Sequence, residues 1–145
     1  MQDNNLLSTP ITKEVLLEAP VSKVWSALTK KEELKQWCFD MEAFEPVEGF
    51  EFHFYGEKDG EKFKHNCRVL RAIPGQEMKW LWSYENVPGD TYVTFYLQPE
   101  GEKTRLTLTH EGLEKLPQDN NYSKGNFVAG WNEIIGNLLP AHLEK

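Results

Sequence analysis

The most suggestive chemistry in the sequence lies where one alternating segment ends. The segment LTLTHEGL, residues 106–113, places His110 next to Glu111. A histidine and a carboxylate can act together as general acid and base only if both reach the same substrate proton. Neighbouring residues of a strand point to opposite faces, so these two side chains are expected to diverge. We therefore interpret His110 as a hydrogen-bonded strand end, and the sequence predicts no catalytic residue.

Three histidines and one cysteine are the other candidates for metal or nucleophile chemistry. His53, His65 and His110 fall in different alternating segments and lack the short spacing of paired metal ligands. Cys67 follows His65 by two residues, on the same face of a strand, which could suggest a thiolate pair. We favour a buried structural cysteine, because most free cysteines behave as small apolar residues. The sequence predicts no metal site and no cofactor, and it shows no phosphate-binding glycine loop or dinucleotide fingerprint.

Five segments between residues 49 and 110 alternate apolar and polar residues. They are GFEFHFYG (49–56), FKHNCRVLRAI (63–73), MKWLWSY (78–84), TYVTFYL (91–97) and TRLTLTH (104–110). Alternation with a period of two predicts strands, and the short turns between them predict an antiparallel meander with one apolar face. The inner side of the second segment is ambiguous, because Val69 and Leu70 should point to opposite faces.

Helical spacing occurs in three other segments. Residues 20–29 and 31–38 predict two short helices, which follow a loosely alternating strand within 11–20. Residues 124–145 contain the longest candidate helix, whose apolar stripe must cover the apolar face of the sheet. Pro140 is expected to kink this helix or end it early. The sequence therefore predicts an α+β fold in the order β-α-α-β(6)-α, with one curved antiparallel sheet wrapped around a long C-terminal helix.

The composition suits one globular domain. The chain has 145 residues, of which 39% are hydrophobic, a net charge of -7 and a mean hydropathy of -0.60. The surplus of acidic residues disfavours nucleic-acid binding, and no apolar run is long enough for a membrane span. We expect residues 1–9 to be a flexible polar tail and residues 10–145 to be the domain. The first residues lack the pattern of a signal peptide, so a cytoplasmic location is expected.

Three stretches of the chain resemble a known superfamily. They are APVSKVWSALTKKEELKQW (19–37), LTLTHEGL (106–113) and GWNEIIGNLLPAHLEK (130–145). The first is similar to the opening of START-like, Bet v 1-like (SRPBCC) domains. The other two resemble the closing signature of the AHSA1-like subgroup, related to the C-terminal domain of the Hsp90 ATPase activator. The resemblance implies a helix-grip fold, whose long helix closes a mostly apolar cavity against the sheet, and relatives that bind lipids, sterols or polyketides.

An open cavity of this kind would be walled by residues of the apolar sheet face and of the helix stripe. The expected wall residues are Phe52, Phe54, Trp80, Trp82, Phe95, Leu108, Phe127, Trp131 and Ile135. The expected polar anchors for a ligand are His110, Tyr84 and Arg71. Aromatic side chains also dominate ordinary cores, so a filled core stays the alternative interpretation of the wall residues.

Three functions are open at this point. The leading hypothesis is the binding of a small hydrophobic molecule, of lipid, sterol-like or polyketide-like type, without catalysis. The second is a chaperone cofactor or stress-response interaction module related to Hsp90 ATPase activators, with a chaperone of the Hsp90 type as partner. The third is a cyclase-like or hydrolase-like enzyme, which some relatives are. It would need two titratable groups that converge inside the cavity, and the sequence offers no such pair.

Overall fold

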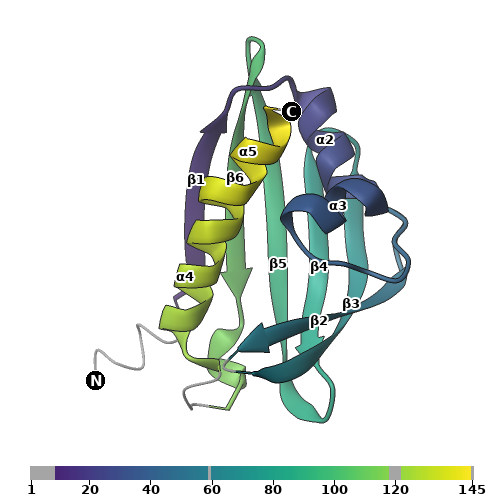
Figure 1. The fold of residues 1–145 in the computed structure, drawn as a ribbon, viewed down its shortest axis with the longest axis vertical. Coiled ribbons are helices and arrows are strands. Elements are labelled where there is room, and N and C mark those ends of the chain that lie inside the picture. Colours follow the sequence, from purple (N-terminus) through teal and green to yellow (C-terminus); the bar gives the residue numbers. More distant parts are fainter. Residues whose placement is uncertain (1–8, 59, 118–121, 145) are drawn as a thin grey trace.

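The computed structural model describes residues 9–58, 60–117 and 122–144, so most of the predicted N-terminal tail (1–8) lies outside the described residues. The elements, in chain order, are β1 (Ile11–Leu17), α2 (Val21–Thr29), α3 (Lys31–Trp37), β2 (Glu51–Lys58), β3 (Glu61–Ile73), β4 (Glu77–Tyr84), β5 (Val87–Glu100), β6 (Lys103–Glu111), the 3-10 turn η1 (Leu113–Lys115), α4 (Lys124–Glu133), the π-helix η3 (Ile134–Leu138) and α5 (Leu139–Leu143). The predicted α+β helix-grip fold is confirmed (Figure 1).

The sheet is an antiparallel meander with β1 added at one edge. Its strand order is β1-β6-β5-β4-β3-β2, so the strands from β2 to β6 lie next to their chain neighbours. Strand β1 forms the edge of the sheet next to β6, with Ile11 opposite His110. The expected order β-α-α-β(6)-α overcounts by one. In the described part of the chain five strands follow the two helices, because each alternating segment forms a single strand, and β1 completes the six.

A β-bulge in β3 resolves the ambiguity at Val69 and Leu70. Val69 pairs with Trp80, but the next paired residue is Arg71, opposite Lys79. Leu70 is thus the extra residue of the bulge, and the alternation restarts one position later. Val69 is fully buried whereas Arg71 is exposed. The bulge therefore turns the side chain of Arg71 to the outer face of the sheet.

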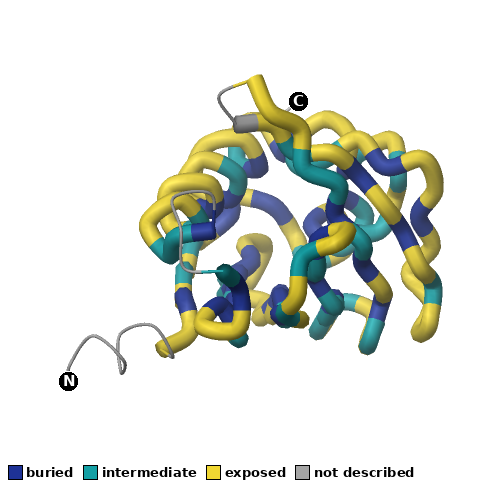
Figure 2. Tube along the Cα trace, turned by 90° about the horizontal axis from the view of Figure 1, so that it is seen from below, coloured by how far each residue is buried: buried dark blue, intermediate teal, exposed yellow. Residues whose placement is uncertain are grey.

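The core fills the space between the sheet and the helices. The C-terminal helix crosses the inner face of the sheet, and α2 and α3 cover the neighbouring part of the same face (Figure 1). Buried positions recur along the inside of the curved strands, with exposed positions between them (Figure 2). Strand β4 shows the pattern most simply, since Met78, Trp80 and Trp82 are buried and the residues between them are partly exposed.

The C-terminal helix continues past Pro140 to Leu143. Its π-helical segment comes first, and there the N–H of Leu139 donates to the carbonyl of Ile134. Pro140 then falls in the first turn of α5, where the missing N–H of proline costs little. Of the kink or early end expected at Pro140, the early end is wrong for this reason. None of the described helices is long and apolar enough to cross a membrane.

Candidate functional site

His110 lies in the middle of a continuous series of buried hydrogen bonds. The indole Nε1 of Trp131 donates to its Nδ1 at 3.0 Å. Indole nitrogen is only a donor, so Nδ1 must be the acceptor and Nε2 carries the hydrogen of the neutral ring. Nε2 lies 2.8 Å from the Thr91 hydroxyl, which donates in turn to the carbonyl of Trp82 at 2.8 Å. Both nitrogens of His110 are therefore occupied, and the network joins α4 to three strands.

Burial keeps His110 neutral. Desolvation, with a smaller effect of His65, lowers the pKa of His110 to about 3. Its neighbour Glu111 is exposed, so the two side chains lie on opposite faces, as strand alternation predicts. The arrangement holds α4 against the sheet and does not bring a carboxylate to the histidine.

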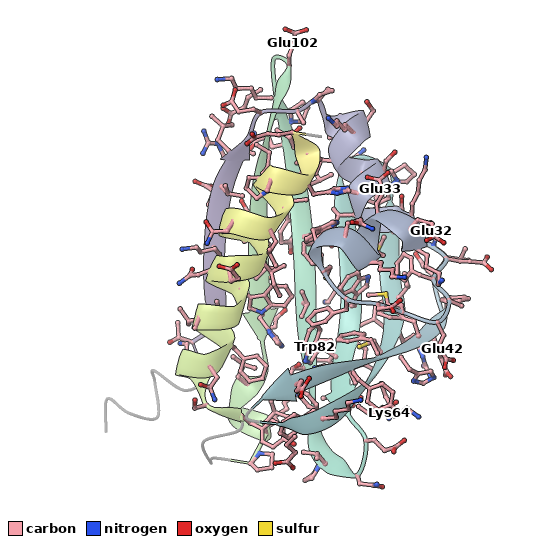
Figure 3. All side chains as sticks on the ribbon, viewed as in Figure 1. Glu32, Glu33, Glu42, Lys64, Trp82 and Glu102 are labelled. Carbon is pink, nitrogen blue, oxygen red and sulfur yellow. The ribbon has the colours of Figure 1, made fainter. Side chains whose placement is uncertain are left out.

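A small aromatic pocket lies beside this network, between α4 and the sheet. It has a volume of about 130 Å³ and is lined by Phe39, His65, Trp82, Tyr84, Asn126, Phe127, Gly130, Trp131 and Ile134. Four of these residues (Trp82, Tyr84, Phe127 and Trp131) belong to the site predicted from the sequence. Asn126 and Gly130 of α4 are exposed, which places the mouth of the pocket along this helix. Figure 3 labels Trp82 inside the curve of the sheet.

The other predicted wall residues form a packed core next to the pocket. Phe52, Phe54, Trp80, Phe95, Leu108 and Ile135 are all buried, and none is among the described residues that line the pocket. The ring of Trp80 packs edge-on against Phe52 and Phe95, with centroids 5.2 and 5.0 Å apart. Aromatic side chains fill this part of the interior, and the open space is correspondingly small.

Arg71, the third predicted polar anchor, lies away from the interior. Its exposed guanidinium Nη1 pairs with Glu77 Oε2 at 3.3 Å on the outer face of the sheet. The β-bulge at Leu70 explains this orientation. His110 stays close to the pocket through Trp131, although both its ring nitrogens are already engaged.

The polar side chains of His65 and Tyr84 in the pocket wall are both neutral. His65 places Nδ1 3.0 Å from the carbonyl oxygen of Phe63, so Nδ1 carries the hydrogen. Burial lowers the pKa of His65 to about 4, which keeps the ring neutral. The Tyr84 hydroxyl accepts from Trp82 Nε1 at 3.0 Å. Burial raises the pKa of Tyr84, so the hydroxyl keeps its hydrogen at neutral pH.

Sequence reasoning missed His65 and Phe39 as pocket residues. Strand alternation could have indicated His65, because it shares a face with the buried Cys67 and Val69. Phe39 lies in the connection after α3, where no periodic pattern exists. Its ring stacks on Phe54 with a centroid distance of 4.2 Å.

The two cysteines are unsuited to thiolate chemistry. Cys67 is buried and Cys38 half-buried, and both are free thiols. Burial raises the pKa of each thiol, and the nearby Cys67 raises the pKa of Cys38 further. With His65 neutral beside it on the strand, Cys67 lacks a cation that could stabilise a thiolate. No group of three potential metal ligands occurs among the described residues.

Two larger hollows lie outside the aromatic pocket. One of about 370 Å³, here named the outer groove, is lined by Glu51, His53, Lys64, Asn66, Cys67, Arg68, Leu81, Ser83 and Glu85. Its polar side chains largely pair with each other. Arg68 donates to Glu51 at 2.7 Å, and Lys64 lies 3.3 Å from Glu85. A second hollow of about 380 Å³ adjoins it near Tyr122.

Comparisons with known proteins agree with the architecture. The family described as Activator of Hsp90 ATPase homolog 1-like protein matches residues 18–144. No curated protein matches the chain. Among solved structures, MLL2253 from Mesorhizobium loti is 24% identical, with a TM-score of 0.78 over 94% of this chain and 97% of that chain.

Two further solved structures are similar to the chain. CalU16 from Micromonospora echinospora is 25% identical, with a TM-score of 0.72 over 92% of this chain and 75% of that chain. DynU16, a protein of the dynemicin biosynthetic locus, is 24% identical, with a TM-score of 0.75 over 94% of this chain and 47% of that chain. The chain thus spans about half the length of DynU16. These likenesses show the fold, which is consistent with a ligand-binding domain.

Proposed function

The chain belongs to the family of Activator of Hsp90 ATPase homolog 1-like proteins, and we propose that it binds a small hydrophobic molecule in the aromatic pocket without transforming it. The observation that carries this proposal is the composition of the pocket wall. Aromatic rings from β4, α4 and the connection after α3 surround a space of about 130 Å³. Apolar walls with a few polar groups are typical of small-molecule sites.

The absence of a paired acid and base among the described lining residues supports binding without catalysis. No Asp, Glu, Lys or Arg is among the described residues that line the pocket. The pKa of His65 is lowered and that of Tyr84 is raised, so both groups are neutral near pH 7. A general base needs a pKa near the working pH to be efficient.

Two glycines of α4 provide a matched test. Gly125 and Gly130 are both exposed and helical, and in the described structure a Cβ at either would meet nothing within 4 Å. Only Gly130 is among the described residues that line the pocket. Gly130→Leu should place a side chain in the mouth and weaken binding at least tenfold, whereas Gly125→Leu should leave it unchanged. Both variants gain helix propensity, so a folding defect is not expected.

Binding can be measured with toluene as the probe, by ligand-observed NMR and by the shift of the melting temperature. Native mass spectrometry of the purified protein, before and after unfolding, would also detect a co-purified molecule. If Gly130→Leu and the wild-type protein bind toluene equally, the pocket is not the binding site. If the wild-type protein binds no probe and carries no extra mass, the proposal fails.

A second candidate function is an interaction module for a chaperone of the Hsp90 type. The observation that favours it is that the outer groove, a polar hollow on the outer face of the sheet, is larger than the aromatic pocket, while most of the predicted cavity is filled. Arg68→Glu would reverse a charge in the outer groove without touching the core, because its side chain is 48% exposed. Under this function Arg68→Glu weakens co-sedimentation with Hsp90, and Gly130→Leu does not.

A further inference from the structure

One wall of the aromatic pocket comes from a segment without regular structure. Residues 38–50 connect α3 to β2, and Phe39 in this connection lines the pocket. The other described lining residues belong to β3, β4 and the C-terminal helix. Phe39 is half-buried. Its position therefore depends on how the connection packs, and not on the hydrogen bonds of a strand or a helix.

The rest of the connection is held in place independently of Phe39. Met41 and Phe44 are buried in the core. Nearer to β2, the N–H of Gly49 donates to the carbonyl of Val69 at 2.8 Å. These contacts anchor the connection beyond Phe39, so a smaller side chain at this position is expected to leave the path of the backbone unchanged.

The ring of Phe39 separates the pocket from the packed core. It stacks on Phe54, with centroids 4.2 Å apart and an angle of 21° between the ring planes. Phe54 also contacts His65 and Trp82, with centroid distances of 4.3 and 5.4 Å. These three neighbours of Phe54 all line the pocket, whereas Phe54 is buried and is not among the described lining residues. Phe54 therefore lies behind the wall that its neighbours form.

The ring of Phe39 can be removed without breaking a side-chain hydrogen bond. Trp131, on the helix side of the pocket, donates to His110 at 3.0 Å. Trp82, on the sheet side, donates to Tyr84 at 3.0 Å. Replacement of either tryptophan would leave a buried group unpaired, which is costly. A phenylalanine side chain has no polar atom, so Phe39 contributes to the wall only through its volume.

The volume of the pocket suits one aromatic ring. A dry apolar cavity of about 150 Å³ accepts benzene, and this pocket has about 130 Å³. A second fused ring has to stay at the mouth, in contact with water. Truncation of Phe39 to alanine removes one six-membered ring from the wall, and packed surroundings collapse only partly into such a space. The enlarged pocket then has room for a second ring, with Phe54 as its new boundary.

From these observations we propose that Phe39 is the specificity-determining residue of the pocket: its ring limits the ligand to a single aromatic ring and excludes a second. This inference rests on the proposed function of the same pocket and adds the residue that sets its size selectivity. It acts through volume alone, so the affinity for a two-ring molecule should rise when the ring of Phe39 is absent.

The test measures dissociation constants of toluene and naphthalene by ligand-observed NMR for the wild-type protein, Phe39→Ala and Phe50→Ala. Phe50 is the matched control, because it is a half-buried phenylalanine of the same connection and is not among the described lining residues. We expect the wild-type protein to bind toluene at least as tightly as naphthalene. Phe39→Ala should bind naphthalene about tenfold more tightly than the wild-type protein does, since a second ring leaves water. Phe50→Ala should not.

Nuclear Overhauser effects between ligand and protein give a second readout. Naphthalene should contact the ring of Phe54 in Phe39→Ala, and toluene should not contact it in the wild-type protein. Circular dichroism reports whether each variant is folded. If Phe39→Ala does not fold, Phe39→Leu provides the same test, because leucine also removes the ring and keeps an apolar contact with Phe54.

The outcomes separate the size limit from the proposed function. If the wild-type protein binds toluene and loss of the Phe39 ring brings no gain in naphthalene affinity, the size limit is overturned while the hydrophobic pocket stands. Equal gains in Phe39→Ala and Phe50→Ala overturn it as well, because they indicate a general loosening of the connection. So does tighter binding of naphthalene than of toluene by the wild-type protein. If the wild-type protein binds neither probe, both proposals fail.

Discussion

Trp131 Nε1 donates to His110 Nδ1 at 3.0 Å across the interface between α4 and β6. This bond fixes the tautomer of the histidine and, through Thr91, connects the helix to the backbone of β4. It also holds one wall of the aromatic pocket in place. The Trp131 side chain therefore both packs α4 against the sheet and shapes the wall of the pocket.

Replacement of Trp131 by Phe should destabilise the protein by about 1–3 kcal/mol, because His110 Nδ1 is then left buried without a donor. Urea denaturation gives the free energy of unfolding. Loss of ring volume also contributes, so the bond itself is isolated by a double-mutant cycle with His110→Phe. A coupling energy between about 0.5 and 3 kcal/mol is expected for residues in one network. Additive effects would show that the bond contributes nothing.

Acid should destabilise the fold as soon as the pH falls below about 6.5, which is higher than the pH range in which carboxylates titrate. Burial lowers the pKa of His65 to about 4 and that of His110 to about 3, against 6.5 for an ordinary histidine. The unfolded chain therefore binds more protons than the folded chain below pH 6.5. Each histidine then removes about 1.4 kcal/mol of stability per pH unit as the pH falls toward its folded pKa. Above pH 6.5 this contribution is fully present.

The measurement is the free energy of unfolding between pH 8 and pH 5. His65→Phe should reduce the slope below pH 6.5 by about half, because it removes one of the two buried histidines whose pKa is lowered. A flat profile between pH 6.5 and pH 5 in the wild-type protein would contradict burial of both neutral rings.

Strand alternation predicted most of the sheet but not the volume that it encloses. Each alternating segment became a strand, because one apolar face must be buried. The bulge at Leu70 depends on pairing between β3 and β4, so no local pattern in either strand predicts it. It decided the orientation of Arg71. Whether the interior is open depends on how the aromatic rings interlock, as for Trp80 against Phe95, and periodicity carries no such information.

The contact between α5 and α3 should stabilise the end of the C-terminal helix. His142 Nε2 lies 2.9 Å from Glu33 Oε1, and the two side chains are 13% and 30% exposed. Glu33→Ala should lower the free energy of unfolding by about 0.5–1.5 kcal/mol and speed amide hydrogen exchange in α5. Glu32 is the matched control, because its side chain is 84% exposed (Figure 3). Equal effects of Glu32→Ala and Glu33→Ala would mean that the contact does not hold the helix.

The thiols of Cys38 and Cys67 should resist alkylation in the folded protein. Burial raises the pKa of both thiols, so the thiolate that attacks iodoacetamide is scarce at pH 8. We expect labelling at least a hundredfold slower than in urea-unfolded protein, followed by mass spectrometry of the intact chain. Cys67→Ala assigns any residual reaction to Cys38, which is the more exposed of the two. Labelling of the folded wild-type protein as fast as of the unfolded chain would show that the sheet and α3 open readily at this point, and the packed core around Cys67 would then not describe the protein in solution.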